Sequence, residues 1–518
     1  MKKIFISLVC FASIIIYSQD GVLDSSFSED GKLFLDTVFN YPNSNTEIIY
    51  DVLEQPDGKT VYLGKSFSSS GFFEPIYCTV FRLNMDGTLD STFGNNGFFS
   101  YSTYTNNKNL FLTASKLLRL SDGSFLIAGH GNNSTNLSAD IIAIKISPNG
   151  ILDTTFGTNG IARFAIGGGN NKIVTCLEVY NDKIYIAGNI DQDIFIIGAN
   201  MDGSFDDNWN SDGKIILDIG GKTNLIQKIQ LLNNKIYAYG INYSEGGMPN
   251  YNISVSAFNL DGSPASYGIN GTTEFYYGNS NANPNISLVI PKGNNETLFV
   301  ISGDFFKINR YGNLDNTFGT GGKIKNPFNQ NFSQSAISSD GSFLMTNSKI
   351  IGQTTNQMAF YTAKVNPDYT KALTFGTNGE AITNVSTPVF KEQFPSRVLV
   401  TNNGKVIVAG SVTTLPNPNV PNIKNQDYVI LRYNNTNLSV KEIQTDELSL
   451  FPNPAKDILS IKTKEQIKKV EILDVSGRII KASSGINDKI NISNLKVGNY
   501  LINVITDKKA YRTKFIKE

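Results

Sequence analysis

Histidine, tryptophan and cysteine are scarce in this 518-residue chain, which holds one histidine, one tryptophan and three cysteines. With His130 as the single histidine, metal sites built from several histidines are excluded, and a Ser-His-Asp triad would depend on one residue. Cys10 lies near the N-terminus, and Cys78 and Cys176 are too far apart in sequence for a metal knuckle or a redox pair. We therefore expect two core thiols, no metal site, no cofactor and no catalytic residues.

Charged residues are also few, at 17% of the chain, and the 45 lysines and arginines balance 45 aspartates and glutamates. Zero net charge provides no general attraction to nucleic acid or anionic lipid, so we expect no nucleic-acid partner. The balance is uneven, because residues 449–518 hold 14 Lys and Arg against 7 Asp and Glu. This step in composition predicts a separate C-terminal domain.

Long apolar runs are absent except at the N-terminus. Lys2 and Lys3 precede an apolar segment of about 14 residues, 4–17, and Ser18 and Gln19 follow it. This segment is too short to span a bilayer comfortably, and its layout is that of a secretory signal peptide. We predict cleavage between Ser18 and Gln19, export through the Sec translocon and no transmembrane segment in the mature protein. An uncleaved N-terminal anchor is the alternative.

What the chain does contain is a recurring phrase rich in turn residues. Its clearest copies are Asn84–Gly97, Ser147–Gly160 and Asn309–Gly322, which share the pattern Gly-x-Leu-Asp-x-Thr-Phe-Gly-x-x-Gly. Weaker copies run over 200–213, 259–271 and 366–379, and a shortened copy is Asp20–Gly31. We call this the Asp-Phe phrase.

Within the first clear copy of the Asp-Phe phrase, Asn84, Asp86 and Asp90 have the short spacing of calcium ligands. Thr88 stands at the third ligand position and no bidentate glutamate follows, so we expect backbone turns instead. We expect Leu89 and Phe93 to fill the space between neighbouring repeats.

A second phrase alternates with the first and predicts a strand that ends in a small residue. It starts with an Asp-Gly or Asn-rich turn and occurs seven times, at 57–64, 122–129, 181–188, 233–240, 295–303, 340–347 and 403–410. The first copy ends at Gly64 and the last at Gly410, which is 346 residues over six intervals, or about 58 residues per repeat. We call this the Gly-ended phrase.

Each repeat holds four apolar runs of strand length, which in the fourth repeat are 214–219, 226–232, 235–241 and 253–260. Asn233-Asn234 joins the second and third runs and accepts the positive φ angles of a tight hairpin. Seven four-stranded antiparallel units predict an all-β fold, a seven-bladed β-propeller over residues 19–439, with a β-solenoid as the alternative. In a closed ring, the segment Asp20–Gly31 should pack beside the strand Tyr428–Tyr433.

These phrases resemble the delta-60 repeat, a propeller-forming family of bacterial extracellular proteins marked by Asp-Gly-x-Leu-Asp-x-x-Phe-Gly-x-x-Gly. The resemblance covers roughly residues 20–438. It implies a propeller fold and an exported protein, and it implies no reaction.

Beyond a polar linker at 440–447, residues 448–518 hold six or seven short strand-like runs and predict a small Ig-like β-sandwich. This segment resembles the type A C-terminal sorting domain of the type IX secretion system of Bacteroidetes. The matching residues are Pro452, Asn453, Pro454, Asp474, Gly477, Gly498, Tyr500 and Lys514. The resemblance implies the type IX secretion machinery as a partner and delivery to the cell surface or the medium; a plain accessory β-sandwich is the alternative.

Irregular insertions at 66–75, 101–112, 130–139, 242–251 and 411–427 should share one face of the ring, opposite the face with the tight turns. Long varied loops on a rigid scaffold are where binding usually resides. We expect exposed aromatic rings there to bind a glycan or protein ligand, unless they cover the cores of their own loops. The candidates are Phe72, Phe73, Tyr101, Tyr104, Tyr243 and Tyr251.

The function expected from these features is that of a non-catalytic binding, adhesion or structural protein, secreted or held on the outer surface of the cell. The alternative is a secreted polysaccharide hydrolase or lyase that draws carboxylates from several blades. Two carboxylates roughly 5–10 Å apart at the ring axis would favour the enzyme.

Overall fold

The computed structural model describes residues 19–518 apart from 36–44, 69–75, 103, 106–107, 110–112, 133–138, 168, 170, 245–249, 280–282, 293–295, 352–356, 386–391, 415–424, 436–447, 464, 474–478, 485–487, 497 and 508–509. The predicted signal peptide, with its cleavage site after Ser18, therefore lies outside the described residues. The chain divides into two compact units, of which the larger ends at Thr436 and the smaller runs from Asn437 to Glu518.

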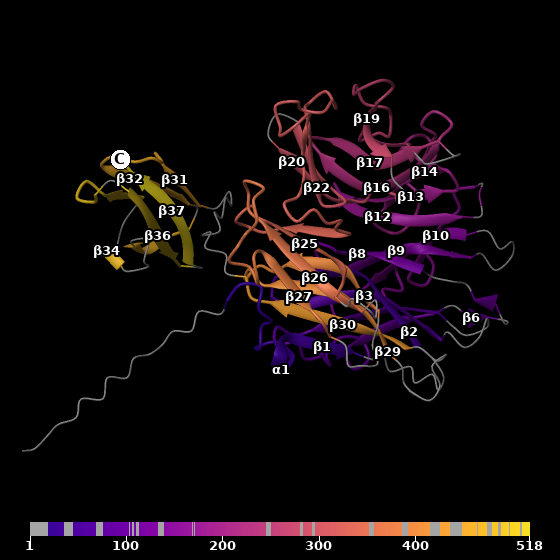
Figure 1. Cartoon of the computed structure of the whole chain (residues 1–518), viewed down its shortest axis with the longest axis horizontal. Helices are drawn as coiled ribbons and strands as arrows, with labels where there is room; N and C mark the ends of the chain where they lie inside the picture. Colours follow the sequence, from indigo (N-terminus) through magenta and orange to yellow (C-terminus); the bar gives the residue numbers. More distant parts are fainter. Residues whose placement is uncertain are drawn as a thin grey trace, which may run out of the picture. The chain divides into compact units, whose positions relative to one another are not determined.

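Seven four-stranded antiparallel blades form the described part of the larger unit (Figure 1). Five of them are separate sheets, whereas blades 7 and 1 share one eight-stranded sheet, because β30 and β2 pair in parallel at Thr46 and Gln426. Blade 1 consists of β2 (Asn45–Glu54), β3 (Thr60–Ser68), β4 (Ile76–Leu83) and β5 (Phe98–Tyr101). Blade 2 consists of β8 (Thr113–Arg119), β9 (Phe125–Asn132), β10 (Ala139–Ile146) and β11 (Ile161–Phe164), and blade 3 of β12 (Lys172–Tyr180), β13 (Lys183–Ile190), β14 (Asp193–Asn200) and β15 (Lys214–Leu217). The short hairpin of β6 (Tyr104–Thr105) and β7 (Lys108–Asn109) lies in the link from blade 1 to blade 2.

The remaining blades follow the same pattern. Blade 4 consists of β16 (Thr223–Leu232), β17 (Lys235–Tyr243), β18 (Asn250–Asn259) and β19 (Thr272–Asn279), and blade 5 of β20 (Ile286–Lys292), β21 (Glu296–Ile301), β22 (Asp304–Ile308) and β23 (Lys323–Ile324). Blade 6 consists of β24 (Gln334–Ile337), β25 (Phe343–Ile350), β26 (Met358–Val365) and β27 (Glu380–Thr383). Blade 7 consists of β28 (Gln393–Val400), β29 (Val406–Thr414), β30 (Asn425–Tyr433) and, from the other end of the chain, β1 (Lys32–Leu35).

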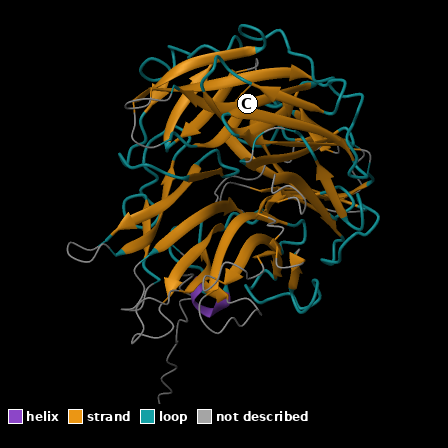
Figure 2. Cartoon of the chain, turned by 90° about the vertical axis from the view of Figure 1, so that its right-hand side faces the viewer, coloured by secondary structure: helices purple, strands orange, loops and turns teal. Residues whose placement is uncertain are grey.

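The first strands of the blades surround a common axis. Each lies against the first strand of the next blade, in the order β2, β8, β12, β16, β20, β24 and β28, and β28 lies against β2. A separate apolar cluster fills each of the seven junctions between neighbouring blades. Figure 2 shows that the chain consists almost entirely of strands and loops, with one short helix among the described residues. The predicted all-β seven-bladed propeller is confirmed.

The boundaries between blades differ from the sequence prediction by one strand. The run at 214–219 was expected to open the fourth unit, but β15 pairs with β14 and is the outermost strand of blade 3. Blade 4 ends with β19, so the Asp-Phe phrase joins the third and fourth strands of one blade instead of linking two blades. The repeat period alone could not show which run begins each blade, because every run has a possible pairing partner on both sides in the sequence. The tight hairpin between β16 and β17 is confirmed, with Asn233 and Asn234 at φ 51° and 58°.

Blade 7 is closed by both ends of the larger unit, as predicted. β1 pairs with β30 along Lys32–Leu35, and the Asp-Phe phrase before β1 bonds to the end of β30. In blade 1 the backbone bonds of this phrase are Gly87 N to Asn84 O and Asp90 N to Arg82 O. Their equivalents in blade 7 are Gly21 N to Asn434 O at 2.7 Å and Asp24 N to Arg432 O at 2.8 Å. Two distant segments thus rebuild one local turn, which includes the short α1 (Ser28–Gly31).

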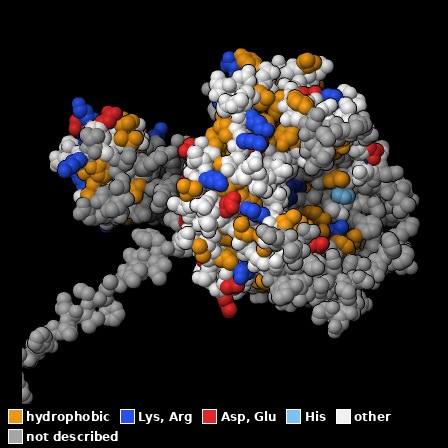
Figure 3. All heavy atoms as spheres, viewed as in Figure 1, with side chains coloured by type: hydrophobic (Ala, Val, Ile, Leu, Met, Phe, Trp, Pro, Cys, Tyr) orange, Lys and Arg blue, Asp and Glu red, His pale blue; other side chains and the backbone are white. Residues whose placement is uncertain are grey.

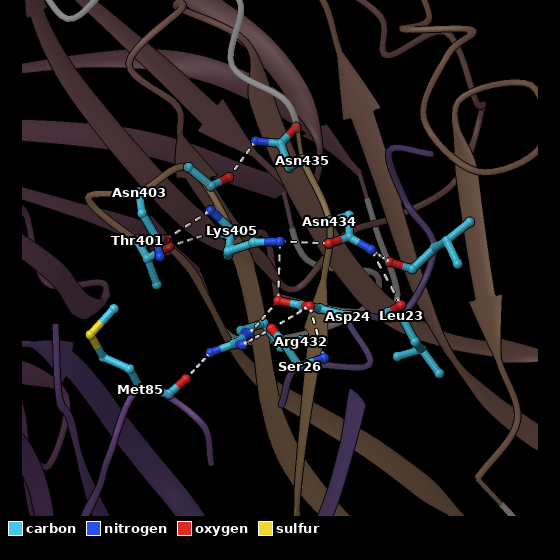
Figure 4. Close-up of polar contacts among 12 residues, drawn as sticks. Leu23, Asp24, Ser26, Met85, Thr401, Asn403, Lys405, Arg432, Asn434 and Asn435 are labelled. Atoms are coloured by element: carbon cyan, nitrogen blue, oxygen red, sulfur yellow. Dashed lines mark hydrogen bonds and ion pairs between the residues drawn. The ribbon is translucent and has the colours of Figure 1, made fainter. Parts of the chain in front are cut away.

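An ion network holds each of these two turns, and we call it the clasp. Figure 4 shows the clasp of blade 7. In blade 7, Asp24 accepts hydrogen bonds from Arg432 Nε at 2.8 Å and pairs with Lys405 Nζ at 3.1 Å, while the Arg432 guanidinium lies 4.7 Å from the centre of the Phe27 ring. In blade 1, Asp90 accepts hydrogen bonds from Arg82 Nε and from Lys59 Nζ, both at 2.7 Å. The Arg82 guanidinium lies 4.8 Å from the centre of the Phe93 ring. The two carboxylates are 6% and 5% exposed.

The Asp-Phe phrases also connect each blade to the next. The backbone N–H just after the phrase aromatic donates to a carbonyl of the next blade's turn, as in Gly94 N to Asn149 O at 2.7 Å and Ser28 N to Asp86 O at 2.8 Å. Phe93 is fully buried, and a Cβ on Gly150 of the next blade would lie 2.8 Å from its ring. The expectation that Phe93 fills the space between blades is confirmed, and the glycine of the phrase is required by this close approach.

The smaller unit is a two-sheet sandwich. One sheet has the order β31 (Leu448–Phe451), β32 (Ile458–Thr463), β35 (Lys489–Asn491), and the other the order β34 (Ile479–Ser484), β33 (Ile467–Leu473), β36 (Gly498–Thr506), β37 (Ala510–Lys517). Apolar side chains from both sheets, including Leu459, Val470, Ile502 and Phe515, form its core. The predicted small β-sandwich is confirmed.

Candidate functional site

Bulges in the first strands bring polar side chains to the ring axis. In six of the seven described first strands the register with the second strand shifts by one residue, and Tyr50, Ser115, Thr175, Gln227, Ser287 and Ser396 are the extra residues. A bulge re-aims the side chain of the extra residue and of its neighbour, which is why such features often occur beside binding sites.

The small residue that ends the Gly-ended phrase makes these bulges possible. Gly64, Gly129, Gly188, Gly240 and Gly410 each pair with the residue that precedes a bulge. A Cβ on Gly129 would lie 2.3 Å from the Thr113 carbonyl oxygen, and one on Gly410 would lie 2.1 Å from the Phe394 carbonyl oxygen. The repeated glycine thus has a structural cause: the bulged backbone occupies the space of a side chain.

A cavity of about 260 Å³ lies where the seven first strands meet. Every blade contributes to its wall, and the contributing side chains include Tyr50, Lys116, Thr175, Lys228, Ser287, Gln334 and Arg397, with Asn285 from the link before β20. Its wall holds three cations and no carboxylate among the described residues. The space is large enough for several waters or one small molecule.

Positive charge accumulates at this cavity. Arg397 Nε lies 3.3 Å from Asp51 Oδ1, and Asp51 Oδ2 also accepts a hydrogen bond from Leu117 N. Lys116 and Lys228 have no ion pair or hydrogen bond to their ammonium groups in the described part of the chain. Burial, followed by the charges of Lys116 and Arg397, lowers the pKa of Lys228 to about 8. Lys228 is still mainly charged at neutral pH.

Glu178 lies in an adjoining hollow of about 380 Å³, whose wall also includes Lys228 and Ser287. Burial raises the pKa of Glu178, while the charges of Lys116 and Lys228 oppose that shift. Glu178 forms no ion pair with a described residue within 4 Å. With Asp51 and Glu178 both counted, the axis carries three cations and two carboxylates.

Neutral hydrogen-bonding groups complete the wall and tie adjacent blades together. Gln227 Nε2 donates to Pro284 O at 2.9 Å and its Oε1 accepts from Ile286 N at 2.5 Å, which fixes both ends of the amide. Ser287 and Ser335 share a hydrogen bond of 2.8 Å, and Ser115 Oγ donates to Val174 O at 2.7 Å. The wall is therefore preorganised, with hydroxyls and amides beside the cations.

The aromatic residues predicted to bind a ligand do not form one exposed patch among the described residues. Tyr251 is 3% exposed, its ring lies 5.1 Å from that of Tyr243, and its hydroxyl donates to Asn283 Oδ1 at 2.7 Å. The expectation of an exposed ring is wrong for Tyr251, because it belongs to the core between blades 4 and 5. Tyr101 and Tyr243 are half-buried against such cores. The side chains of Phe72, Phe73 and Tyr104 lie outside the described residues.

The two internal cysteines and the histidine are buried or nearly so. Cys78 and Cys176 are buried free thiols, as expected, and burial raises the pKa of Cys78 to about 12. Burial and the charge of Lys65 lower the pKa of His130 to about 4, which keeps its ring neutral at physiological pH. Among the residues described, no three His, Cys, Asp or Glu side chains gather as a metal site would require.

The side-chain oxygens that resembled calcium ligands accept hydrogen bonds within the turn. Asp86 Oδ1 accepts from Thr88 N at 2.9 Å and Thr88 Oγ1 at 2.7 Å, and Asn84 Nδ2 donates to Thr88 Oγ1 at 3.0 Å. Asp90 belongs to the clasp. These residues shape the turn and its contact with the next blade.

The axial residues were not predicted from the sequence. The signal that could have found them is a pair of consecutive residues that breaks the alternation between two buried positions, as in Ser115-Lys116 and Gln227-Lys228. Such a pair in the first run of most repeats indicates a bulge at a fixed height on the axis.

In the smaller unit, two of the predicted sorting residues, Asn453 and Tyr500, have defined side-chain contacts with the last strand. Asn453 Oδ1 accepts a hydrogen bond from Ile516 N at 2.9 Å, and the exposed Pro452 and Pro454 flank it. The Tyr500 ring lies 5.6 Å from that of Phe515, and its hydroxyl donates to Lys496 O at 2.8 Å. Gly498 starts β36, and Lys514 is in β37. Asp474 and Gly477 lie outside the described residues.

Comparison with known families assigns this unit. Residues 449–518 match the secretion system C-terminal sorting domain family. The smaller unit is a type IX sorting domain. The presence of a sorting domain implies secretion. Residues 55–93 match a β-propeller domain of unknown function, DUF5122, which agrees with the fold of the larger unit.

Comparisons with curated proteins and with solved structures assign no domain beyond the sorting domain and the propeller. No curated protein matches the chain. Similar solved structures include a subtype N11 neuraminidase-like protein from a flat-faced bat isolate from Peru, at 8% identity and TM-score 0.32, covering 82% of this chain and 98% of that one. A Penicillium chrysogenum α-L-arabinanase is similar at 13% identity and TM-score 0.32, covering 71% of this chain and 97% of that one. In the part of the chain that is described, no helix has the length and apolarity needed to cross a membrane.

Proposed function

We propose that this chain is a non-catalytic binding protein, delivered by the type IX secretion machinery to the cell surface or the medium after export through the Sec translocon. The observation that carries the proposal is the axial cavity, to which all seven blades contribute a preorganised set of hydroxyl, amide and cationic groups. These groups donate and accept hydrogen bonds, and among the described residues the cavity wall itself supplies no carboxylate for acid–base hydrolysis. Of the two carboxylates near the axis, Asp51 is paired with Arg397 and Glu178 lies in the adjoining hollow.

The surface around the axis supports binding more than catalysis. Among the described residues on the face seen in Figure 3, charged side chains of both signs are scattered, without an extended patch of one sign. His130, the single histidine, is held neutral and is not one of the residues that line this cavity. A rigid ring with a polar axial cavity is suited to holding a small ligand, or a terminal group of a larger one.

The destination is tested by export of two deletions in the native cell. A chain that lacks 448–518 should accumulate in the periplasm, and a chain that lacks 1–18 should stay in the cytoplasm. Appearance at the surface without the sorting domain would contradict the proposed route.

The binding role is tested with the full chain from Gln19, screened against glycan and protein arrays and, in parallel, incubated with polysaccharides. We expect retained ligands and no released reducing sugar or unsaturated product. Turnover of any polysaccharide would favour the alternative, a secreted hydrolase or lyase.

A further inference from the structure

The axial cavity is electrostatically incomplete. Three cations face it, Arg397 is paired with Asp51, and the two lysines have no partner close enough for an ion pair among the described residues. Bringing like charges together in a partly dehydrated cavity is unfavourable unless an opposite charge is supplied. Glu178, in the adjoining hollow, is affected by the charges of both lysines but forms no ion pair within 4 Å with either of them.

The lysines lie next to groups that fit a polar, hydroxyl-bearing molecule. Lys228 is adjacent to Gln227 on the bulge of β16, and Lys116 is adjacent to Ser115 on the bulge of β8. Ser287, Asn285 and Thr175 line the same cavity. The bulged backbone that the repeated glycines permit therefore holds cations and neutral donors at one height on the axis.

The position and size of the cavity limit what can enter it. Its lining residues lie at the start of β20 and β24, in the first half of β12 and near the middle of β2, β8, β16 and β28. At about 260 Å³ it is just below the usual range of drug-sized sites, so a group of monosaccharide size would fill it.

We propose that the axial cavity binds a small organic oxyanion, a carboxylate or phosphate carried on a hydroxyl-bearing body such as a sugar. Lys116 and Lys228 contact the anionic group, Arg397 adds its field, and Gln227, Asn285 and Ser287 contact the hydroxyls. This inference rests on the proposed binding function and names the chemistry of the ligand.

The test uses the full chain from Gln19, with four probes titrated by calorimetry: glucuronate, glucose 6-phosphate, inorganic phosphate and glucose. We expect both sugar anions to bind and glucose to bind at least roughly tenfold more weakly, since a charge-assisted hydrogen bond accounts for a factor of this size. A preference for glucuronate identifies a sugar acid, and a preference for glucose 6-phosphate identifies a sugar phosphate. Equal binding of glucose, or no binding of any anion, would overturn the proposal.

Two lysine variants locate the site. Lys228→Gln should weaken sugar-anion binding by roughly tenfold or more and, without ligand, should raise the melting temperature, because repulsion with Lys116 and Arg397 is removed. Lys292→Gln changes an exposed lysine at the far end of β20 and should alter neither value. Undiminished affinity in Lys228→Gln would also overturn the proposal.

The outcome is separable from that of the proposed function. If the sugar anions fail to bind but the array screen finds another ligand whose binding survives Lys228→Gln, the binding function stands and the axial anion site is wrong. If the screen finds no ligand and polysaccharide is cleaved, the proposed function itself fails.

Discussion

Blade 1 and blade 7 have the same clasp but are assembled differently. In blade 1 the clasp joins Asp90 to Arg82, eight residues away, whereas in blade 7 it joins Asp24 to Arg432, 408 residues away. Distances, burial and the stacked aromatic ring are nearly the same in the two blades. The geometry is therefore set by the blade and not by chain connectivity, and only the entropy of bringing the partners together differs.

The largest effect on this comparison is expected from removing the segment that the N-terminal end contributes to blade 7. Deletion of 20–35 takes away the Asp-Phe phrase and β1, exposes the edge of β30 and leaves blade 7 with three strands. We expect a loss of more than about 5 kcal/mol, enough to unfold a typical domain, seen as the absence of a cooperative thermal transition in circular dichroism. A synthetic peptide of residues 20–35 should restore the transition. An unchanged melting curve would show that closure through β1 is dispensable.

The clasp itself is compared by Asp24→Ala and Asp90→Ala. Each leaves a buried arginine and a lysine without their carboxylate, which should cost about 3–5 kcal/mol in either blade. The variants should differ in hydrogen exchange: Asp24→Ala should accelerate exchange of β1, because only that strand is attached through the clasp to a distant segment. Ser26→Ala, which removes a donor but no charge, is the milder control. Equal exchange of β1 in the two aspartate variants would refute the distinction.

A smaller difference is expected at the bulge glycines. Gly410→Ala in blade 7 would place Cβ 2.1 Å from a backbone carbonyl oxygen, whereas Gly64→Ala in blade 1 would place it 2.3 Å from the hydroxyl end of Tyr428. Overpacking of this kind costs about 1–3 kcal/mol, and backbone cannot move aside as a side chain can. Gly410→Ala should therefore lower the melting temperature more than Gly64→Ala. The reverse order in urea titrations would count against this explanation of the repeated glycine.

The smallest effect is expected from acid. Burial alone would raise the pKa of Asp24 and Asp90, but hydrogen bonds from Ser26 and Thr92 and the nearby cations hold both pKa values below the ordinary 3.8. Because a carboxyl group with a lowered folded pKa stabilises the fold above its unfolded pKa, stability should fall as the pH drops below about 4. Asp24→Asn and Asp90→Asn should each flatten this fall in urea titrations between pH 5 and 2. A slope identical to that of the unmodified chain would exclude the clasp as its source.

The sequence predicted the outer part of the propeller well and its axis poorly. Local turn residues in the two phrases predicted the seven repeats and the hairpin at Asn233-Asn234. They also predicted that residues 20–31 dock on the last strand of the ring. The blade phase was off by one strand because β15 could pair on either side. Lys116 and Lys228 look like ordinary solvent-facing positions, and only the register shift turns them inward. Tyr251 looked like a loop residue, but the core between blades 4 and 5 extends to the end of β18.

The pairing of β1 with β30 also imposes an order of assembly. A chain that crosses a membrane from its N-terminus presents residues 20–35 first, yet their partner strand ends at Tyr433. During translocation the first segment must remain unpaired until almost all of the ring has emerged, and each incomplete ring exposes an unsatisfied strand edge. Because blade 7 needs strands from both ends of the larger unit, the complete propeller can form only after the whole ring has crossed.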